Sequence, residues 1–335
     1  MVSINDVARH AQVSVATVSN YLNRPAKVAP ATARRIGASI EQLGFVPRLS
    51  ARQLRWRRSG IVGICVVNAS NPFFAQVVRA AERSLSLAGL SVVVGSSYES
   101  SEQQAHLLGL FEQMRFDAVL VAPSGDIDDL YGLRRRGTPV VLVDQVDPLG
   151  VLPGVGVDHV AGGRAVAEHL VEQGRRRLLL ATGPSGVNQT MLREEGFRSE
   201  AERHAGVSVT VVRSPDLSLV DGDKVGHEIL GLPEGDRPDA VFGANDMHAI
   251  GIQKALLTAG TRIPSEVALV GYDDIPFAEY AAVPLTSVRQ PADEIGRGAA
   301  ELLLGELGRT VEGGSVTERV PVLVERESSA ARYPA

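Results

Sequence analysis

A stretch of short polar and methyl-bearing side chains near the N-terminus has the residue types that contact a DNA duplex. Thr17 and Ser19 can donate hydrogen bonds to phosphate oxygens, which positions a protein on DNA without reading its sequence. Asn20 can pair bidentately with adenine, while Val15 and Ala16 can touch the methyl group of thymine. The alternative is that these side chains lie on an ordinary solvated helix face, so the interpretation depends on the elements around them.

Caps and spacing in this region predict three short helices. Ser3 begins a capping box for a first helix, and Ser14 can cap a second helix that extends through Leu22. Pro30 suits the first position of a third helix, and Gly44 supplies its C-terminal stop. Each helix has one apolar face, formed by Ile4, Val7, Ala8, Ala11, Val18, Leu22, Ile36, Ile40 and Leu43. Two helices joined by a short turn and braced by a third form a helix-turn-helix, whose second helix would lie in the major groove.

The charge of the chain is unevenly distributed. Residues 1–59 hold ten basic and two acidic residues, whereas the rest of the chain holds 24 basic and 37 acidic residues. A small basic module joined to a large acidic body is typical of a head that binds a polyanion. Charge alone leaves open the alternative of a solvated basic face.

From Gly60 onward, short apolar runs rich in β-branched residues alternate with segments of helical period. This alternation predicts a parallel sheet with helices on both faces. The runs form two series, at 61–67, 91–95, 117–122 and 139–143 and then at 177–182, 207–212, 239–245 and 267–274. We therefore expect an α/β body of two doubly wound parallel-sheet subdomains. Loops at the carboxyl ends of their strands would line a cleft between them.

Motifs that indicate an enzyme are missing from this pattern. Neither series has a phosphate-binding glycine loop after its first strand, and the glycine-rich stretch 154–163 lacks the spacing of a dinucleotide fingerprint. The seven histidines include no pair at the spacing of metal ligands on a helix, so we expect no metal and no cofactor. Carboxylates near arginines leave open a general acid–base pair, but nothing selects one. A binding or regulatory protein is the favoured class.

The single cysteine, Cys65, excludes a disulfide framework and fits a reducing compartment. The first residues form no apolar signal core, and no run of about eighteen apolar residues occurs. We therefore expect a cytoplasmic protein. The same observation disfavours a solute-binding protein that captures sugars for transport, although the body alone would permit that function.

The strings INDVARHAQVSVATVSNYLNRP and LGFVPRLSARQL are similar to the N-terminal segment of the LacI/GalR family of bacterial transcription repressors. The match is ordered and nearly complete over residues 3–58. It implies that Val15, Ala16 and Asn20 occupy the base-reading positions of the recognition helix. Many relatives carry Arg where this chain has Asn20, so their operator preferences do not transfer to it.

The same resemblance implies a hinge helix over residues 49–56, with Leu54 as the apolar wedge that enters the minor groove. Eight residues are too few for a stable isolated helix, so we expect this helix to order only on operator DNA. The predicted DNA contacts are Ser14, Val15, Ala16, Thr17, Ser19, Asn20, Asn23, Ala51, Leu54 and Arg55.

The resemblance continues more weakly through the body, in stretches such as SNPFFAQ, GPSGVNQTMLREEGF, GANDMHAIG and VGYDDIPFAEY. It implies the fold shared with periplasmic sugar-binding proteins and an effector site between the subdomains. Asp273, Asn245 and Arg193 match effector-facing positions, where a carboxylate, an amide and a guanidinium can grip vicinal hydroxyls. An ordinary ion pair between loops is the alternative for Arg193 and Asp273. The remaining candidates are Phe73 and Phe74, an aromatic contact or core residues, and Asn68, Asp144 and Asn188.

The expected molecule is a homodimeric repressor that binds pseudo-palindromic operator DNA and a small effector, with a sugar favoured. A nucleobase or phosphorylated sugar acting as corepressor, and an architectural DNA binder that ignores metabolites, are the alternatives. The expected domains are a helix-turn-helix domain at 1–46, a hinge helix and linker at 47–59, and an effector-binding and dimerisation body at 60–335. Within the body we expect an N-subdomain at about 60–158 and 290–318 and a C-subdomain at about 160–288 and 320–333.

Overall fold

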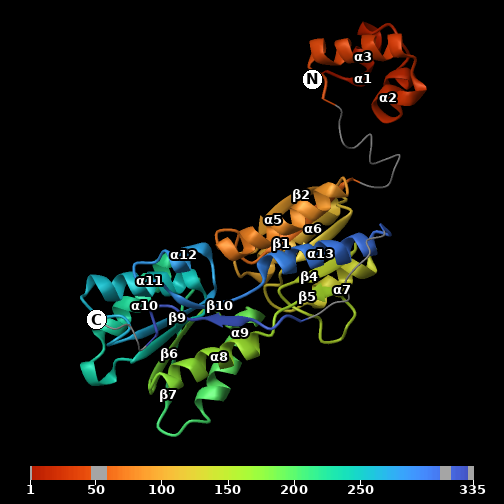
Figure 1. Cartoon of the computed structure of the whole chain (residues 1–335). Coiled ribbons are helices and arrows are strands. Elements are labelled where there is room, and N and C mark those ends of the chain that lie inside the picture. The colour runs from red at the N-terminus through yellow and green to blue at the C-terminus, as the bar shows by residue number, and fades with distance from the viewer. Residues whose placement is uncertain (1, 47–58, 310–317, 331–335) are drawn as a thin grey trace. The chain divides into compact units, whose positions relative to one another are not determined.

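The computed structural model describes residues 2–46, 59–309 and 318–330. The chain separates into two compact units, Met1–Ser59 and Gly60–Ala335, and each is described by itself (Figure 1). Among the described residues, no helix is long and apolar enough to cross a membrane.

The first unit is a bundle of three helices joined by short turns. Its elements are α1 (Ile4–His10), α2 (Val15–Asn23), the 3₁₀ turn η1 (Pro25–Lys27) and α3 (Pro30–Leu43). Ser3 caps α1 in a reciprocal capping box with Asp6, Ser14 caps α2, and Gly44 ends α3 in the left-handed conformation. The apolar faces meet in a core of Val7, Ala8, Ala11, Val18, Ile36 and Phe45. The three predicted helices are confirmed.

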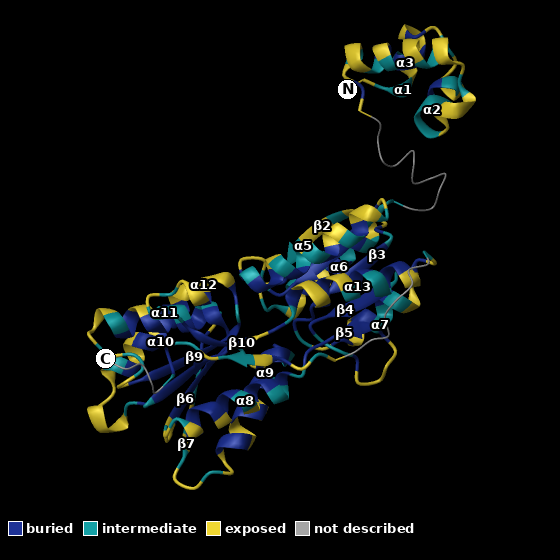
Figure 2. Cartoon of the chain, in the orientation of Figure 1, coloured by how far each residue is buried: buried dark blue, intermediate teal, exposed yellow. Residues whose placement is uncertain are grey.

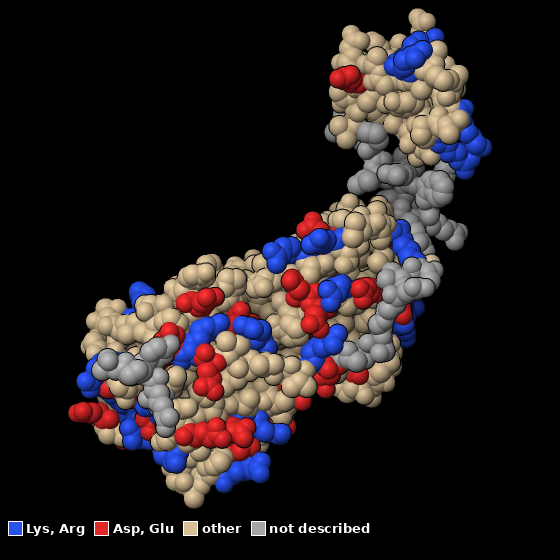
Figure 3. Space-filling view, viewed as in Figure 1, with Lys and Arg blue, Asp and Glu red and all other residues tan. Residues whose placement is uncertain are grey.

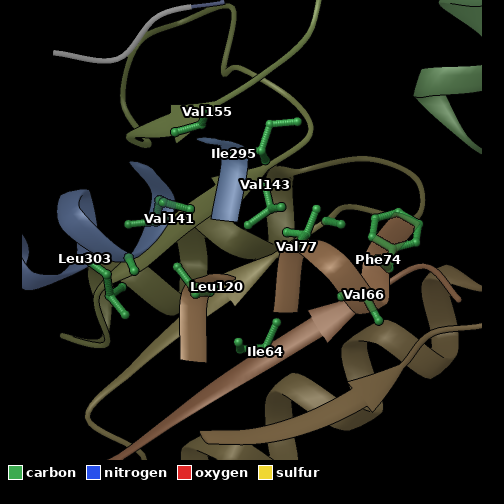
Figure 4. Packing of buried hydrophobic residues seen from close by; sticks show 14 of the residues in the cluster. Ile64, Val66, Phe74, Val77, Leu120, Val141, Val143, Val155, Ile295 and Leu303 are labelled. Carbon is green, nitrogen blue, oxygen red and sulfur yellow. The ribbon is translucent and has the colours of Figure 1, made fainter. Parts of the chain in front are cut away.

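The second unit contains two parallel-sheet subdomains, and the first is built on five strands in the order β2-β1-β3-β4-β5. The strands are β1 (Ile61–Val66), β2 (Ser91–Ser96), β3 (Ala118–Val121), β4 (Val140–Val143) and β5 (Gly154–Val155). The covering helices are α5 (Pro72–Leu87) and α13 (Ala292–Glu306) on one face and α6 (Ser101–Gln113) and α7 (Asp128–Arg135) on the other. Figure 4 shows Val77 of α5 and Ile295 of α13 packed near Val143 of β4. Because helices cover both faces, the central strands are buried throughout, which is why they read as continuous apolar runs.

The second subdomain is built on six strands in the order β11-β10-β9-β8-β6-β7, with only β11 antiparallel to its neighbour. The strands are β6 (Arg177–Thr182), β7 (Ser208–Arg213), β8 (Ala240–Gly243), β9 (Ala268–Asp273), β10 (Thr286–Arg289) and β11 (Val322–Val324). The helices are α8 (His159–Glu172) and α9 (Asn188–Ala201) on one face, and α10 (Leu219–Gly231) and α11 (Asp246–Thr258) on the other. Two short elements, η2 (Glu234–Asp236) and α12 (Pro276–Glu279), lie in the connections. The predicted doubly wound α/β body is confirmed.

The two subdomains are not consecutive in sequence, because the chain passes between them more than once. It leaves β5 for α8 and returns from β10 to α13, and Val157 pairs with Arg319 in an isolated parallel bridge. The first subdomain therefore receives α13 from late in the chain, and α13 packs against α5. The cleft between the subdomains lies beside these crossings.

Helices α8 and α9 pack with their backbones in close approach at two glycines. A Cβ atom at Gly163 would overlap the carbonyl oxygen of Arg193, and a Cβ atom at Gly196 would overlap that of Val160. Any larger side chain would push α9 away from α8. The glycines therefore set the position of α9, including that of Arg193.

Candidate functional site

Helix α2 presents the small side chains that the sequence assigns to DNA contact. Val15 is 40% exposed, and Ser14 and Ala16 are also exposed, while Thr17 is half-buried. Ser14 Oγ accepts a hydrogen bond from the backbone N–H of Thr17 and lies 2.8 Å from its hydroxyl. The start of α2 is thus a capped helix end with small side chains outward, a shape that suits the major groove.

The later residues of α2 are half-buried. Ser19, Asn20 and Asn23 all belong to this class, and the Asn23 amide donates to the carbonyl oxygen of Ser19 at 2.8 Å. Asn23 is therefore already used within the helix. The predicted contacts Ala51, Leu54 and Arg55 lie outside the described residues.

The first unit carries exposed cations on all of its helices or directly after them. They are Arg9, Arg24, Lys27, Arg34 and Arg35, and Figure 3 shows Lys and Arg side chains on the surface of this unit. Such a surface attracts phosphates regardless of base sequence, and it makes binding sensitive to salt.

A cavity of about 340 Å³ lies between the two subdomains of the second unit. Its volume falls at the low end of the range for small-molecule sites, about 300–1,000 Å³. Its lining includes Asn68, Asn71, Phe73, Phe74, Tyr98, Glu99 and Asp144 from the first subdomain and Gln189, Thr190, Arg193, Asp216, Asn245 and Asp273 from the second. Nearly all follow the carboxyl ends of parallel strands, where ligands bind in open α/β sheets.

Asp273 joins the two subdomains directly. Its Oδ2 accepts a hydrogen bond of 2.8 Å from Asn71 of the first subdomain, and its Oδ1 accepts one of 2.7 Å from Gln290. Arg193 Nη2 lies 3.7 Å from Oδ1. Burial raises the pKa of the Asp273 carboxyl, whereas Arg193 and the two amides act in the opposite direction.

Two of the aspartates in the cavity wall have backbones in the left-handed region. The φ angle of Asp273 is +105° and that of Asp144 is +61°. Non-glycine residues with positive φ are uncommon, and Asp and Asn tolerate the conformation best. Such backbones cluster at functional sites, where the surrounding contacts hold them.

Arg193 is held in place by partners on every side. Its guanidinium lies 3.8 Å from the centroid of the Tyr272 ring, and Nη1 donates to the carbonyl oxygen of Ala244 at 2.6 Å. Nε donates to His159 Nδ1 at 3.3 Å, so Nδ1 is the unprotonated nitrogen of that ring. The remaining nitrogen, Nε2, lies 3.3 Å from the backbone oxygen and from Oδ1 of Asp144. This buried chain links α9 and α8 to the end of β4 in the other subdomain.

The other predicted residues have mixed placements. Asn245 lines the cavity and caps α11 by accepting from the backbone N–H of His248 at 2.8 Å. Phe73 and Phe74 line the cavity and also belong to the core beneath α5, with their rings edge to face at a centroid distance of 5.1 Å. Asn68 lines the cavity and accepts from the N–H of Ser70. The two phenylalanines are therefore core residues that also border the cavity, and their contact with an effector stays a prediction.

Asn188 is the predicted residue that the structure does not bring to the cavity. It lines a separate open depression on the outer side of α9, with Met191, Glu195 and Arg198 among its neighbours. The helical period explains the difference, because Gln189, Thr190 and Arg193 share the inner face and Asn188 points away from it. Asn188 therefore lies outside the cavity lining, and its contact with an effector stays a prediction that this placement does not support.

Several cavity residues escaped the sequence interpretation. Asn71 and Gln189 lie in stretches that resemble the LacI/GalR family, but the sequence predicts effector contacts only for residues near them. Gln189 is 3% exposed, and neither polar atom of its amide has a hydrogen-bond partner within the described structure. A buried amide without partners costs free energy unless a ligand or water satisfies it. The spacing of four residues between Gln189 and Arg193, one helical turn, is the signal that could have identified it.

The fold and this site define a class, a helix-turn-helix unit followed by a periplasmic-binding-protein-like body. The model for "Bacterial regulatory proteins, lacI family" matches residues 3–48, and that for "Periplasmic binding protein-like domain" matches residues 167–329. The ribose operon repressor of Escherichia coli is 30% identical over 98% of this chain and its own full length. The repressor PurR of Serratia proteamaculans is 31% identical over 98% of this chain and 97% of its own.

Solved structures show the same architecture. The lac repressor dimer bound to operator and the anti-inducer ONPF is 26% identical, with a TM-score of 0.78 over 98% of this chain and 99% of that one. The CelR–cellobiose complex is 30% identical, with a TM-score of 0.65 over 98% of this chain and all of that one. The chain belongs to the LacI family and is a DNA-binding transcriptional regulator.

Proposed function

We propose that this regulator is a repressor whose operator affinity is controlled by a small hydroxylated metabolite, a sugar, bound in the cavity. The observation that carries the proposal is the hydrogen bond from Asn71 to Asp273, which spans the two subdomains within the cavity wall. A ligand that engages both side chains changes the relative stability of the subdomain arrangements. The effector contacts proposed are Asn68, Asn71, Phe73, Phe74, Asp144, Gln189, Arg193, Asn245 and Asp273.

A sugar is favoured over a nucleobase by the lining of the cavity. Carboxylates and amides with paired donors and acceptors suit hydroxyl groups. The aromatic rings of Phe73 and Phe74 are packed edge to face within the core, so they do not form two open faces between which a base could stack. Relatives named for ribose and a relative complexed with cellobiose support this choice, while the PurR relatives keep the nucleobase as the alternative to test.

The proposed active form is a cytoplasmic homodimer on a pseudo-palindromic operator. The edge strand β2 exposes Val93 and Val94, α12 exposes Phe277, and Tyr280 is exposed directly after α12 (Figure 2). Exposed apolar side chains of this kind are candidates for a subunit contact. A two-fold axis lets two heads read two half-sites. The proposed domains are residues 1–46, 47–59 and 60–335, with Ser14, Val15, Ala16, Thr17, Ser19, Asn20, Asn23, Ala51, Leu54 and Arg55 on the DNA.

The proposal is tested by two linked experiments on the full-length protein. DNA fragments selected by the protein from random sequence define the operator, and thermal denaturation in the presence of sugars and nucleobases identifies the effector. A ligand that binds the folded state raises the melting temperature. We expect a sugar to raise the melting temperature and to change operator affinity. If only nucleobases raise the melting temperature, the proposed effector is a nucleobase and not a sugar.

A further inference from the structure

Two carboxyl groups meet across the cleft at a part of the cavity that the Arg193 network does not use. Glu99 follows β2 in the first subdomain, and Asp216 follows β7 in the second. Both side chains line the cavity, and burial together with the neighbouring Asp216 carboxyl raises the pKa of Glu99. Glu99 Oε2 is buried and finds no donor among the described residues. Within the described part of the chain, this end of the cavity therefore has no positively charged lining residue next to Glu99 and Asp216.

The charges around the cavity are predominantly negative. Among the described residues that line it, Glu99, Asp144, Asp216 and Asp273 are acidic and Arg193 is basic. Arg193 is 4% exposed, and its guanidinium is committed to the carbonyl of Ala244, to His159 and to Asp273. Among the described lining residues the only cation is therefore already engaged, so an anionic ligand must compete with Asp273 for Arg193.

A second observation indicates that a ligand occupies this space. Gln189 lines the same cavity, is 3% exposed, and has both amide atoms without partners in the described part of the chain. Its amide can accept from a hydroxyl or ammonium group and can donate to a hydroxyl oxygen. The carboxyl pair and the amide together offer mostly acceptor atoms.

We propose that Glu99 and Asp216 select the effector by charge. They accept hydrogen bonds from a hydroxyl or ammonium group of the ligand, and they exclude phosphorylated and other anionic metabolites. This inference rests on the proposed sugar-sensing function and narrows its ligand class to neutral and amino sugars. Specificity of this kind arises from repulsion of the wrong ligand as much as from attraction of the right one.

The raised pKa of Glu99 agrees with this role. Burial, Asp216 and Asp221 raise the pKa of Glu99 to about 7. Asp221 forms an ion pair with Lys224 at 2.6 Å, so the Lys224 ammonium group is engaged by Asp221 and not by Glu99. With a pKa of about 7, Glu99 exchanges a proton near neutral pH, and a hydroxyl or ammonium donor of the ligand can take the place of that proton. A phosphate group brings acceptors and negative charge to carboxyl groups that need donors.

The test compares matched sugars on the full-length protein. The melting temperature of the protein is measured with several pentoses and hexoses. Each sugar is compared with its own amino-deoxy derivative and its own phosphate ester. The best ligand and its phosphate ester are then titrated by calorimetry into the parent, Glu99→Gln, Asp216→Asn and the control Glu102→Gln. Glu102 lies in the first turn of α6 in the same subdomain, outside the cavity lining.

We expect the phosphate ester to bind at least about tenfold more weakly than its parent sugar. The ratio of the Kd of the phosphate ester to the Kd of the parent sugar should fall by about threefold or more in Glu99→Gln and in Asp216→Asn. Glu102→Gln should leave this ratio unchanged. A stronger response to the amino sugar identifies ammonium as the donor at this site, and a stronger response to the neutral sugar identifies hydroxyl; both support the proposal. Equal or tighter binding of the phosphate ester, or a ratio that neither cavity variant alters, overturns it. If no sugar of any kind shifts the melting temperature, the proposed function fails together with it.

Discussion

The substitution Asp273→Asn isolates the charge of the carboxylate that joins the subdomains while keeping its shape. In the parent, both oxygens accept short hydrogen bonds, at 2.8 Å from Asn71 and 2.7 Å from Gln290. An asparagine can accept only one of these donors, and its own amide N–H groups face the other. One hydrogen bond is lost and a buried donor is left without an acceptor, which costs about 1–3 kcal/mol.

Two further effects of Asp273→Asn oppose each other. The guanidinium of Arg193 loses an anion at 3.7 Å, but it keeps its bond to the carbonyl of Ala244. Conversely, burial raises the pKa of Asp273, so removal of the charge relieves a desolvation penalty. We expect these effects to cancel in large part, and the free energy of unfolding to fall by about 2 kcal/mol.

The assay is urea unfolding of full-length protein followed by circular dichroism, with Asp293→Asn as the control. Asp293 forms an ion pair with Arg79 at 3.7 Å in which the two side chains are 68% and 73% exposed. Neutralising an exposed pair changes stability by about 0–1 kcal/mol. If Asp273→Asn is as stable as Asp293→Asn and keeps the parent's response to the effector, the reasoning about this carboxylate is wrong.

Four other outcomes are expected. Arg193→Ala should abolish the shift in melting temperature caused by the effector while operator affinity without effector changes by less than about threefold; a retained shift would remove Arg193 from the site. Gly196→Ala should lower the free energy of unfolding by about 2 kcal/mol because its Cβ overlaps the carbonyl of Val160, and an unchanged value would contradict the close packing of α8 and α9. Burial lowers the pKa of His248 to about 4 from 6.5, so the unfolded state binds more protons and stability should fall as pH drops through that window. The loss totals about 3 kcal/mol and should shrink in His248→Gln, as acid unfolding measures directly. The logarithm of the association constant for operator DNA should fall steeply as the logarithm of the salt concentration rises. An affinity that does not change with salt would contradict the role of the basic residues of the first unit in binding phosphates.

Local signals made the first unit predictable. The capping box between Ser3 and Asp6, the cap at Ser14 and the stop at Gly44 lie within a few residues of the ends that they set. The buried strands of the second unit were also evident, because their β-branched runs are long enough to be distinguished from loops. The two-residue strand β5 carries no such pattern, and its pairing with β4 depends on the finished sheet.

The candidate site was only partly predictable, because side-chain direction depends on where a helix begins. The resemblance supplied Arg193, Asn245 and Asp273, which line the cavity. It also supplied Asn188, which lies outside the cavity lining, and not its neighbour Gln189, which lies within it. His159 and Tyr272 contact the guanidinium of Arg193 and hold it in place. No local sequence pattern indicates these two contacts. Their contact depends on packing of α8 against β9, where Gly162 leaves space for the Tyr272 hydroxyl. The glycines of the stretch 154–163 thus serve close packing rather than phosphate binding.

Control of DNA binding by the cavity is tested most directly by operator affinity, measured by fluorescence anisotropy with and without a saturating concentration of the sugar that stabilises the protein most. The sugar should change the Kd for operator DNA by at least about tenfold, in either direction, and the Asp273→Asn and Arg193→Ala variants should lose most of that change. An operator Kd that is the same with and without the bound sugar would contradict the central claim that the cavity controls the DNA-binding head.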